Sequence, residues 1–466
     1  MKYKLNKIEE FLRELTGVVG KEWVTAEREF IEGYLKDETP EPVRPRASNN
    51  LILVKPSSTE EVSQVLKIAN GRKVPVFPVG GRTGLVGASV PIKPGVVLSL
   101  ERMNKLEIDR ENLMAVAEAG ATLGDLFKAC DGAGLFFPPH PGDEGAQIGG
   151  LIATNAGGVR AVKYGVMRNY VKGVEVVLPT GEVLNLGGKL IKDNTGYDLL
   201  HLIIGSEGTL CVITKAIIKL HPKSKFTATV VVPFNSRHVA LQSVRNILLS
   251  GVIPLAIEYV ELSEINLSAA HLNEKWPVQA GKVQLLIILI GESEEELLQA
   301  CEKVSASCGE ECVEEPLLAE TRDEQERILK IRSNIYTALK PRLVDILDVT
   351  VPPSKLEELM DALEKIAAKH SVHFPVYGHA GDGNLHVHIM KEEDKDSDYI
   401  SKVKKEIYEA GIRMGGVITG EHGIGAIRTQ ELALTTSQKE LSLMRGIKSL
   451  FDPNNIMNPG KVILTV

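Results

Sequence analysis

The length and charge of the chain exclude several classes of protein. With 466 residues it is too long for one ordinary compact core, so two domains, or one domain with a large insertion, are expected. The net charge of −7 disfavours nucleic acid as a partner, because phosphate binding needs a basic face. No apolar run is long enough to span a bilayer, so no transmembrane segment is predicted.

The N-terminal segment, residues 1–17, is predicted to be an amphipathic helix. It carries Glu9, Glu10 and Glu14 and lacks the continuous apolar region of a secretory signal. A cytoplasmic location is therefore expected. The five cysteines are an odd number in a long chain and do not form a disulfide framework. Cys301, Cys308 and Cys312 are expected on a helix face, because an iron–sulfur site needs four thiolates at tighter spacing.

Residues 51–222 are predicted to alternate strands and helices, as an α/β domain does. After a strand at 51–54, a helix is expected to start at Ser58 as N-cap, with Glu61 completing a capping box. Its apolar stripe at helical spacing is Val62, Val65, Leu66 and Ala69. Further strands are predicted at 74–79, 96–100 and 114–119, a helix at 122–134, and a hairpin of 174–178 with 183–186.

The pattern changes near Pro222. Residues 223 to about 412 read as long strands, such as 283–290, and charged amphipathic helices, such as 292–305 and 355–369. From Gly415 the glycines return, which predicts a return to the first domain. We therefore divide the chain into residues 1–222, 223–414 and 415–466. No internal repeat is apparent.

Three glycine clusters lie in the first part of the chain, at residues 80–87, 142–165 and 205–209. Glycine lets a ligand approach main-chain N–H groups, and successive N–H groups form a nest that suits a pyrophosphate. A Walker A loop is disfavoured because residues 80–87 contain no lysine. A Rossmann fingerprint is disfavoured because Gly80, Gly81, Gly84 and Gly87 have the wrong spacing and Pro91 interrupts.

These segments resemble the vanillyl-alcohol-oxidase, or PCMH-type, family of FAD proteins. The matching motifs are PVGGRTG at 78–84, IGGLIATNAGG at 148–158 with KYG at 163–165, GYDL at 196–199 leading to IGSEGTL at 204–210, and FDPNNIMNPGK at 451–461. The resemblance implies an α+β fold. It consists of a PCMH-type FAD-binding domain of two α/β subdomains and an inserted ferredoxin-like α+β cap at residues 223–414.

The resemblance also implies FAD, with its diphosphate at the first loop and the rest along the second and third. Some relatives attach FAD through a histidine in the first loop. Arg82 occupies that neighbourhood here, so FAD is expected to be non-covalent, although His140 lies just before the second cluster. The residues assigned to FAD are Pro78, Gly80, Gly81, Arg82, Thr83, Gly84, Gly142, Gly149, Thr154, Asn155, Gly157, Gly158, Gly205, Glu207, Gly208, Ile213 and Asn458.

Four of the eleven histidines fall in two short motifs, GHAGDGNLHVH at 378–388 and GEHGIG at 420–425. Two histidines and a carboxylate can form an open divalent-metal site. His386 and His388 would share one strand face, because strand side chains alternate. Any one of these histidines alone would more often be an ordinary core or loop residue. Together with the Glu421-His422 pair they favour a functional site.

Both motifs resemble the branch of the family that contains the glycolate oxidase large subunit, D-lactate dehydrogenases and D-2-hydroxyglutarate dehydrogenases. That resemblance implies His379, His386 and Glu421 as ligands of a divalent metal, with zinc, iron(II) and manganese all suitable. It implies His422 as the catalytic base, which takes the hydroxyl proton while the flavin accepts a hydride.

Two further residues are assigned through the same resemblance. Arg332 resembles the arginine that holds the substrate carboxylate; the alternative is a surface arginine on a charged helix. His388 stands where many relatives carry asparagine beside that carboxylate, which leaves its role open between metal ligand and carboxylate donor. Relatives that use dicarboxylates carry a lysine where this chain has Ile346, two residues before Asp348. A monocarboxylate such as D-lactate or glycolate is therefore expected.

The electron acceptor is predicted to be a separate molecule, because no haem or iron–sulfur ligand set and no second nucleotide site appears. The chain resembles the lactate dehydrogenase subunit that works with an electron-transferring flavoprotein in electron bifurcation. Alternatives are a glycolate or D-2-hydroxyglutarate dehydrogenase, a non-redox flavoprotein like alkyl-glycerone-phosphate synthase, and a flavin- or metal-binding subunit without catalysis. Homo-oligomer formation stays open.

Overall fold

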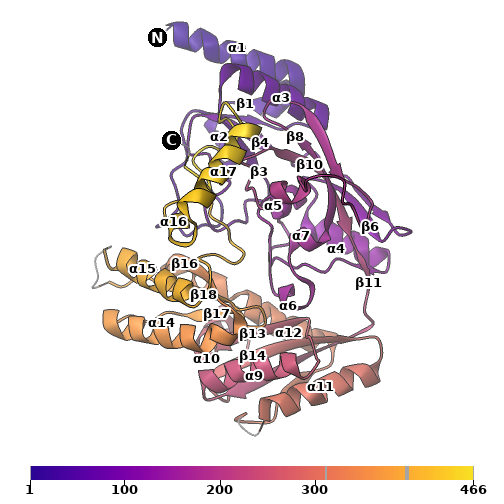
Figure 1. Cartoon of the computed structure of the whole chain (residues 1–466), viewed down its shortest axis with the longest axis vertical. Coiled ribbons are helices and arrows are strands. Elements are labelled where there is room, and N and C mark those ends of the chain that lie inside the picture. The colour runs from indigo at the N-terminus through magenta and orange to yellow at the C-terminus, as the bar shows by residue number, and fades with distance from the viewer. Residues whose placement is uncertain (1, 310–311, 394–397, 465–466) are drawn as a thin grey trace.

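The computed structural model describes residues 2–309, 312–393 and 398–464 and arranges them in two bodies (Figure 1). The upper body in that view contains both ends of the chain, and the lower body contains the strands and helices of residues 226–413. Among the described residues, no helix combines the length and apolarity needed to cross a bilayer.

The upper body is built on two sheets, with strand orders β1-β2-β4-β3 and β5-β6-β10-β8-β9, and a small pair, β11-β7. The strands β2, β4 and β3 pair in parallel, and the second sheet is antiparallel. The strands are β1 (Val24–Thr25), β2 (Leu51–Val54), β3 (Val76–Val79), β4 (Gly95–Ser99), β5 (Leu106–Asp109), β6 (Met114–Glu118), β7 (Leu135–Phe136), β8 (Val171–Val177), β9 (Val183–Gly187), β10 (Val212–Lys219) and β11 (His221–Pro222).

Short and medium helices cover these sheets: α1 (Lys2–Val19), α2 (Arg28–Ile31), α3 (Thr59–Arg72), α4 (Leu123–Gly132), α5 (Ile148–Ala153), α6 (Ala161–Tyr164), α7 (Met167–Tyr170) and α8 (Leu200–Ile203). The predicted start of α3 is correct, because the Ser58 side chain accepts from the Glu61 N–H at 3.2 Å. The Glu61 carboxylate, however, accepts from the Ser57 N–H, so the expected capping box is shifted by one residue. The four residues of the predicted apolar stripe are fully buried.

The lower body is one antiparallel sheet of seven strands in the order β15-β12-β14-β13-β17-β18-β16. Its strands are β12 (Phe226–Phe234), β13 (Ala256–Glu261), β14 (Val283–Gly291), β15 (Leu317–Ala319), β16 (Leu343–Thr350), β17 (Val376–His379) and β18 (Asn384–Met390). Its helices are α9 (Arg237–Leu249), α10 (Leu262–His271), α11 (Glu294–Cys308), α12 (Arg322–Ser333), α13 (Ile335–Leu339), α14 (Leu356–His370) and α15 (Asp398–Arg413).

This sheet contains the same topology twice. The strands β12 to β15 have the spatial order fourth-first-third-second, which is the ferredoxin-like arrangement. The strands β16 to β18 repeat its first three strands, and isolated bridges from Val417 and Thr419 to β16 stand where a fourth strand would be. The sequence analysis had found no internal repeat. We call these halves the first unit (residues 226–319) and the second unit (residues 343–419).

The two faces of the lower sheet have different environments. One face packs its alternate apolar side chains against α9, α11, α14 and α15. The opposite face is covered in part by α10, α12 and α13, and it carries Glu258, Tyr377 and His386. The polar residues of β16, β17 and β18 that build the site lie on this face, because they alternate along each strand with apolar residues that point to the other face.

The end of the chain returns to the upper body, where α16 (Leu432–Thr435) and α17 (Gln438–Phe451) follow (yellow in Figure 1). Met457 pairs with Val76 of β3, and the Val76 N–H donates to the Ile456 carbonyl at 2.7 Å. Ile456 and Met457 belong to the same core as the apolar stripe of α3. We propose domain boundaries at 222/223 and 414/415. Val417 and Thr419, just after the second boundary, still pair with β16 of the lower sheet.

Candidate active site

A cleft runs along the upper body between the loop after β3, α5 and the loop before β10. It is lined by twelve of the residues assigned to FAD: Pro78, Gly80, Gly81, Arg82, Thr83, Gly84, Gly149, Thr154, Glu207, Gly208, Ile213 and Asn458. Parts of the three glycine-rich segments, far apart in the sequence, thus line one cleft.

The other five assigned residues, Gly142, Asn155, Gly157, Gly158 and Gly205, are not part of the lining of this cleft. The Asn155 side chain accepts from the Arg168 N–H, and the Gly205 N–H donates to the Ile152 carbonyl, so both brace α5. A side chain at Gly158 would overlap the His140 carbonyl, whereas Gly142 has open space beside it. A Cβ at Gly157 would stand 2.8 Å from Glu421 Oε2, which places the end of the second cluster against the histidine motifs.

The cleft fits FAD by the chemistry of its lining. A Cβ on Gly81 would overlap the Gly145 carbonyl oxygen, so only bare backbone can pass there. Two buried polar atoms on the lining, Gln147 Oε1 and Asn458 Oδ1, have no hydrogen-bond partner among the described residues. Leaving a buried acceptor unsatisfied costs about 1–3 kcal/mol, so a ligand with hydroxyl or imide donors suits this cleft.

The two histidine motifs meet beside this part of the upper body. Glu421 Oε1 lies 3.4 Å from His379 Nε2 and 3.4 Å from His386 Nε2, and these three ligand atoms are within 4.8 Å of one another. All three side chains are largely buried. The Nδ1 of His379 donates to Glu258 Oε1 at 2.6 Å, and histidine metal ligands are commonly held by a carboxylate in this way. The donor set fits zinc, iron(II) or manganese.

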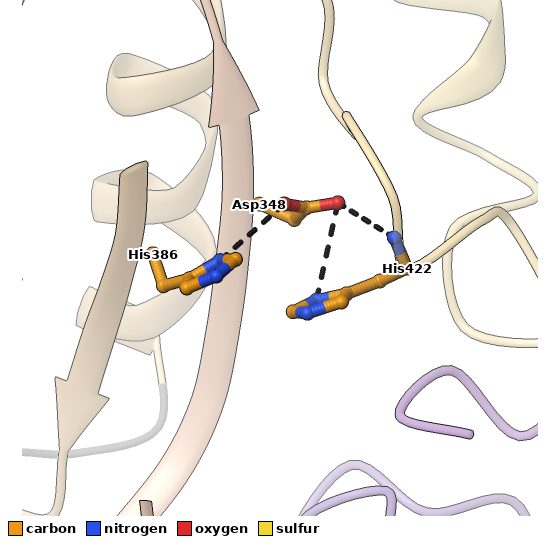
Figure 2. Close-up of side chains that lie close together, drawn as sticks. All are labelled: Asp348, His386 and His422. Atoms are coloured by element: carbon orange, nitrogen blue, oxygen red, sulfur yellow. Dashed lines mark hydrogen bonds and ion pairs between the residues drawn. The ribbon is translucent and has the colours of Figure 1, made fainter. Parts of the chain in front are cut away.

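A second group of possible ligands is Asp348, His386 and His422 (Figure 2). Asp348 is already saturated, however. Its Oδ2 accepts from the Thr419 hydroxyl and from the N–H groups of residues 420, 421 and 422, and its Oδ1 accepts from the Asn384 amide. Burial would raise the pKa of Asp348, but His422 and His386 outweigh it and hold the pKa well below its usual range. Asp348 is therefore an anchor for the loop.

His422 sits at the centre of that loop. Its ring stacks on the His386 ring at 5.0 Å between centroids, and its Nε2 lies 3.8 Å from Glu421 Oε1. Burial lowers the pKa of His422 below its ordinary value, which favours the neutral form that accepts a proton. Beyond His422 the loop is held by Glu207 of the cleft, whose carboxylate accepts from the N–H groups of Ile424 and Gly425.

Arg332 is buried at the end of α12 and is not a surface residue. Its Nε donates to Glu258 Oε2 at 2.9 Å, its Nη2 donates to the same oxygen, and its guanidinium lies 4.8 Å from the centre of the Tyr377 ring. Glu258 thus contacts both Arg332 and His379.

His388 is fully buried opposite Ile346 in the sheet. Its Nδ1 lies 3.1 Å from the Pro375 carbonyl, which can only accept, so Nδ1 carries the hydrogen. Its Nε2 is buried without a partner among the described residues, and His388 is outside both groups of possible metal ligands. Burial lowers the pKa of His388 to about 3, so as a neutral ring it offers an acceptor toward the site.

Three features of the site were not identified from the sequence: Glu258, the anchoring role of Asp348 and the second role of Glu207. A signal for the first two was present, because a carboxylate inside a buried strand is costly unless it is paired. Glu261 and Asp345 are buried carboxylates on the same two strands, so this signal alone does not single out the residues of the site.

Comparisons with known proteins agree with this geometry. Residues 51–187 match the family described as FAD binding domain, and residues 223–462 match FAD linked oxidases, C-terminal domain. A D-lactate dehydrogenase of Archaeoglobus fulgidus is 44% identical over 93% of this chain and 96% of its own length. Glycolate oxidase subunit GlcD of Bacillus subtilis is 37% identical over 88% of each chain.

Solved structures show the same fold at low identity. An alkyldihydroxyacetonephosphate synthase matches with a TM-score of 0.75 and 21% identity, over 97% of this chain and 85% of the other. The 4-ethylphenol oxidase of Gulosibacter chungangensis matches with a TM-score of 0.77 and 18% identity, over 98% and 97%. The chain belongs to the FAD-linked oxidase family. The predicted resemblance and the α+β fold with a PCMH-type FAD-binding part are confirmed.

Proposed function

We propose that the protein is an FAD- and metal-dependent dehydrogenase that oxidises a D-2-hydroxy acid, with D-lactate giving pyruvate. The observation that carries this proposal is the convergence of His379, His386 and Glu421 on one point, with His422 stacked beside it. This cluster adjoins the FAD cleft, because Gly157 contacts Glu421 and Glu207 holds the loop after His422. The names of the relatives support the substrate class.

Each group has a defined part in the reaction. FAD bound in the cleft would supply the hydride acceptor, and His379, His386 and Glu421 would hold a divalent metal that would polarise the substrate hydroxyl. His422 accepts the hydroxyl proton, a role that typically contributes about 10²–10⁴-fold to the rate. Arg332 is the proposed partner of the substrate carboxylate.

Ile346 and His388 support a monocarboxylate substrate. They pair across β16 and β18 on the site face of the sheet, and both are buried. Ile346 is apolar and neutral His388 offers an acceptor, so neither would hold a second carboxylate. D-Lactate or glycolate is therefore favoured over D-2-hydroxyglutarate.

We further propose non-covalent FAD, a cytoplasmic location and a separate acceptor protein, an electron-transferring flavoprotein, for the electrons. Arg82 lies in the first loop where some relatives have a histidine. All five cysteines are free, and Cys130, Cys211 and Cys308 are buried, which argues against an internal iron–sulfur relay.

Anaerobic flavin reduction tests the proposal. The metal-replete, FAD-loaded protein is mixed separately with D-lactate, L-lactate, glycolate and D-2-hydroxyglutarate, and the absorbance of oxidised flavin is followed. D-Lactate should bleach the flavin, and His422→Asn should lose at least about 100-fold in the bleaching rate while FAD and metal content stay unchanged. If none of the four acids bleaches the flavin, the dehydrogenase proposal is wrong.

A further inference from the structure

Glu258 occupies the joint between the two units of the lower sheet. It lies on β13, the edge strand of the first unit, directly opposite His379 on β17 of the second unit. Only 1% of Glu258 is exposed. A buried carboxylate is costly to desolvate unless every lone pair has a partner. The partners of Glu258 therefore indicate why it is there.

The first oxygen of Glu258 determines the state of His379. Glu258 Oε1 accepts from His379 Nδ1 at 2.6 Å, so Nδ1 carries the hydrogen. In a neutral imidazole the other nitrogen is then an acceptor with a free lone pair. That nitrogen, His379 Nε2, faces Glu421 Oε1 at 3.4 Å, where a metal would bind. Glu258 thus holds the ring in the tautomer and orientation that a metal ligand needs.

The second oxygen of Glu258 determines how Arg332 is presented. Glu258 Oε2 accepts from Nε and Nη2 of Arg332, which uses one edge of the guanidinium. A guanidinium has five N–H donors, and three of them remain: two form the edge between Nη1 and Nη2, and the third, on Nη1, points back toward Cδ. None of the three donates to an acceptor among the described residues. The free edge has the geometry to take a carboxylate through two parallel hydrogen bonds.

The plane of the guanidinium is held as well. Arg332 lies over the Tyr377 ring at 4.8 Å, and Tyr377 stands two residues before His379 on the same face of β17. The free edge of Arg332 and the free Nε2 of His379 are therefore placed relative to each other through one carboxylate and one strand.

We propose that Glu258 is a positioning residue that holds the metal-binding histidine and the carboxylate-binding arginine at a fixed separation. The inference rests on the proposed function, because it assigns a metal to His379 and a substrate carboxylate to Arg332. A 2-hydroxy acid has its hydroxyl and carboxylate on adjacent carbons. Glu258 sets the spacing of the two groups that receive them.

The test compares three variants. Glu258→Gln keeps the size of the side chain but gives either His379 or Arg332 an N–H group in place of an acceptor. Glu258→Asp keeps the charge and shortens the reach by one methylene. The control is Glu261→Gln, a buried carboxylate on the same strand that pairs with Arg237 at 2.8 Å, away from the histidine cluster.

Two measurements are made on FAD-loaded protein: the chelator concentration that removes half of the bound zinc or manganese, by elemental analysis, and the KM and kcat for D-lactate. Glu258→Gln should lose its metal at a chelator concentration at least about tenfold lower than the wild type. Its KM for D-lactate should rise at least about tenfold. Glu258→Asp should give values between those of the wild type and of Glu258→Gln. Glu261→Gln should match the wild type in both measurements. The FAD content should be the same in all four proteins.

Each outcome decides the proposal. Wild-type metal retention and KM in Glu258→Gln would overturn it, as would a wild-type protein that binds no divalent metal. Equal losses in Glu258→Gln and Glu261→Gln would show a structural effect only and would also overturn it. If Glu258→Gln does not fold, the comparison of Glu258→Asp with the control decides. Loss of metal in Glu258→Gln, from a wild type that oxidises no hydroxy acid, would keep the positioning role and reject the proposed function.

Discussion

The Asp348 carboxylate holds the backbone that presents Glu421 and His422. It accepts from three consecutive main-chain N–H groups and from two side chains, and its own side chain is 3% exposed. Hydrogen bonds to a charged group contribute about 1.5–3 kcal/mol each. The position of the loop that carries the proposed catalytic base therefore depends on a residue that need not touch the substrate.

Asp348→Asn should reduce both stability and chemistry. Removing the charge leaves the three N–H groups with a weaker acceptor, or facing an amide N–H₂, so the free energy of unfolding should fall by about 3 kcal/mol. A loop displaced by about 1 Å can cost about 100-fold in rate.

Denaturant unfolding and single-turnover flavin reduction measure these two effects of Asp348→Asn. Asp131→Asn, an exposed carboxylate beside Lys223, is the control. A normal reduction rate in Asp348→Asn would contradict the anchoring role.

His373 and Glu264 form a pair whose contribution to stability depends on pH. His373 Nε2 lies 3.4 Å from Glu264 Oε1. This hydrogen bond raises the pKa of His373, with Glu261 adding to the effect and burial and Arg237 opposing it. Burial would raise the pKa of Glu264, but the bond to His373 and its neighbours hold it below the ordinary value.

The raised pKa of His373 and the lowered pKa of Glu264 determine at which pH values the pair stabilises the protein. The histidine part is fully present below about pH 6.5 and is lost as pH rises through the raised pKa of His373. The glutamate part is present above about pH 4.5 and is lost as pH falls through the lowered pKa of Glu264. His373→Gln should therefore lower the free energy of unfolding by about 0.5 kcal/mol near pH 5.5 and leave it unchanged near pH 9. The effect is small because the His373 side chain is 63% exposed and solvent screens its interaction with Glu264. Urea unfolding at both pH values checks this, and an equal loss at both would contradict it.

Among the elements, the first glycine loop offers a sharp comparison. A Cβ at Gly81 would overlap the Gly145 backbone carbonyl, which cannot rotate away, whereas a Cβ at Gly71 in α3, outside the cleft, meets no atom within 4 Å. Gly81→Ala should force the loop away from the second glycine segment and weaken FAD binding at least about tenfold. Gly71→Ala should retain FAD. FAD content after dialysis and the temperature of flavin release measure the difference. Equal retention by both variants would show that close packing at Gly81 is not needed.

Helices and strands were predicted well where the pattern of apolar and capping residues within the element itself determines it. The strand 51–54 and the buried stripe of α3 are as expected, because both depend on neighbouring residues. The strand predicted at 74–79 is shorter, because β3 starts at Val76, after Pro75, which has no N–H for a ladder. The helix predicted at 122–134 runs from Leu123 to Gly132, and Thr122 is its N-cap.

The contents of the site were predictable only in part. The histidine motifs and glycine loops could be found because their residues lie close together in sequence. Glu258 can be noticed as a carboxylate in a buried strand, but its partner cannot be predicted, because it reaches His379 across 121 residues of chain and through a strand pairing that no local pattern encodes. For the same reason the free edge of Arg332 depends on a partner that the sequence does not identify.

At the scale of the whole molecule, the C-terminal segment closes the FAD-binding body. Met457 is fully buried beside β3, in the core that also contains α3. Met457→Ala should lower the free energy of unfolding by about 2–5 kcal/mol and lower the temperature of flavin release. Leu450→Ala, at a side chain that is 79% exposed, should change neither. A stable Met457→Ala protein would indicate that the upper body folds without this segment.

The repeated topology of the lower body was not visible in the sequence. The two units share the order of their strands. The helices α9 and α11 of the first unit and α14 and α15 of the second unit cover the same face of the sheet. Their connections differ, because α10 stands between β13 and β14 and has no counterpart between β17 and β18. Topology of this kind depends only on where apolar faces are buried, so two units can share it without similar amino-acid sequences.

The joint between the units bears on how the protein can diverge over evolutionary time. β13 and β17 pair at only two positions, Glu258 with His379 and Tyr259 with Gly378. The first unit supplies one carboxylate to the site through that joint, while the second supplies the histidines proposed to bind a metal. Insertions and deletions in connections of the first unit away from this joint would leave these pairs in register. A one-residue slip at the joint would turn Glu258 to the other face, so descendants of this chain should vary in those outer loops while retaining the alignment of β13 with β17.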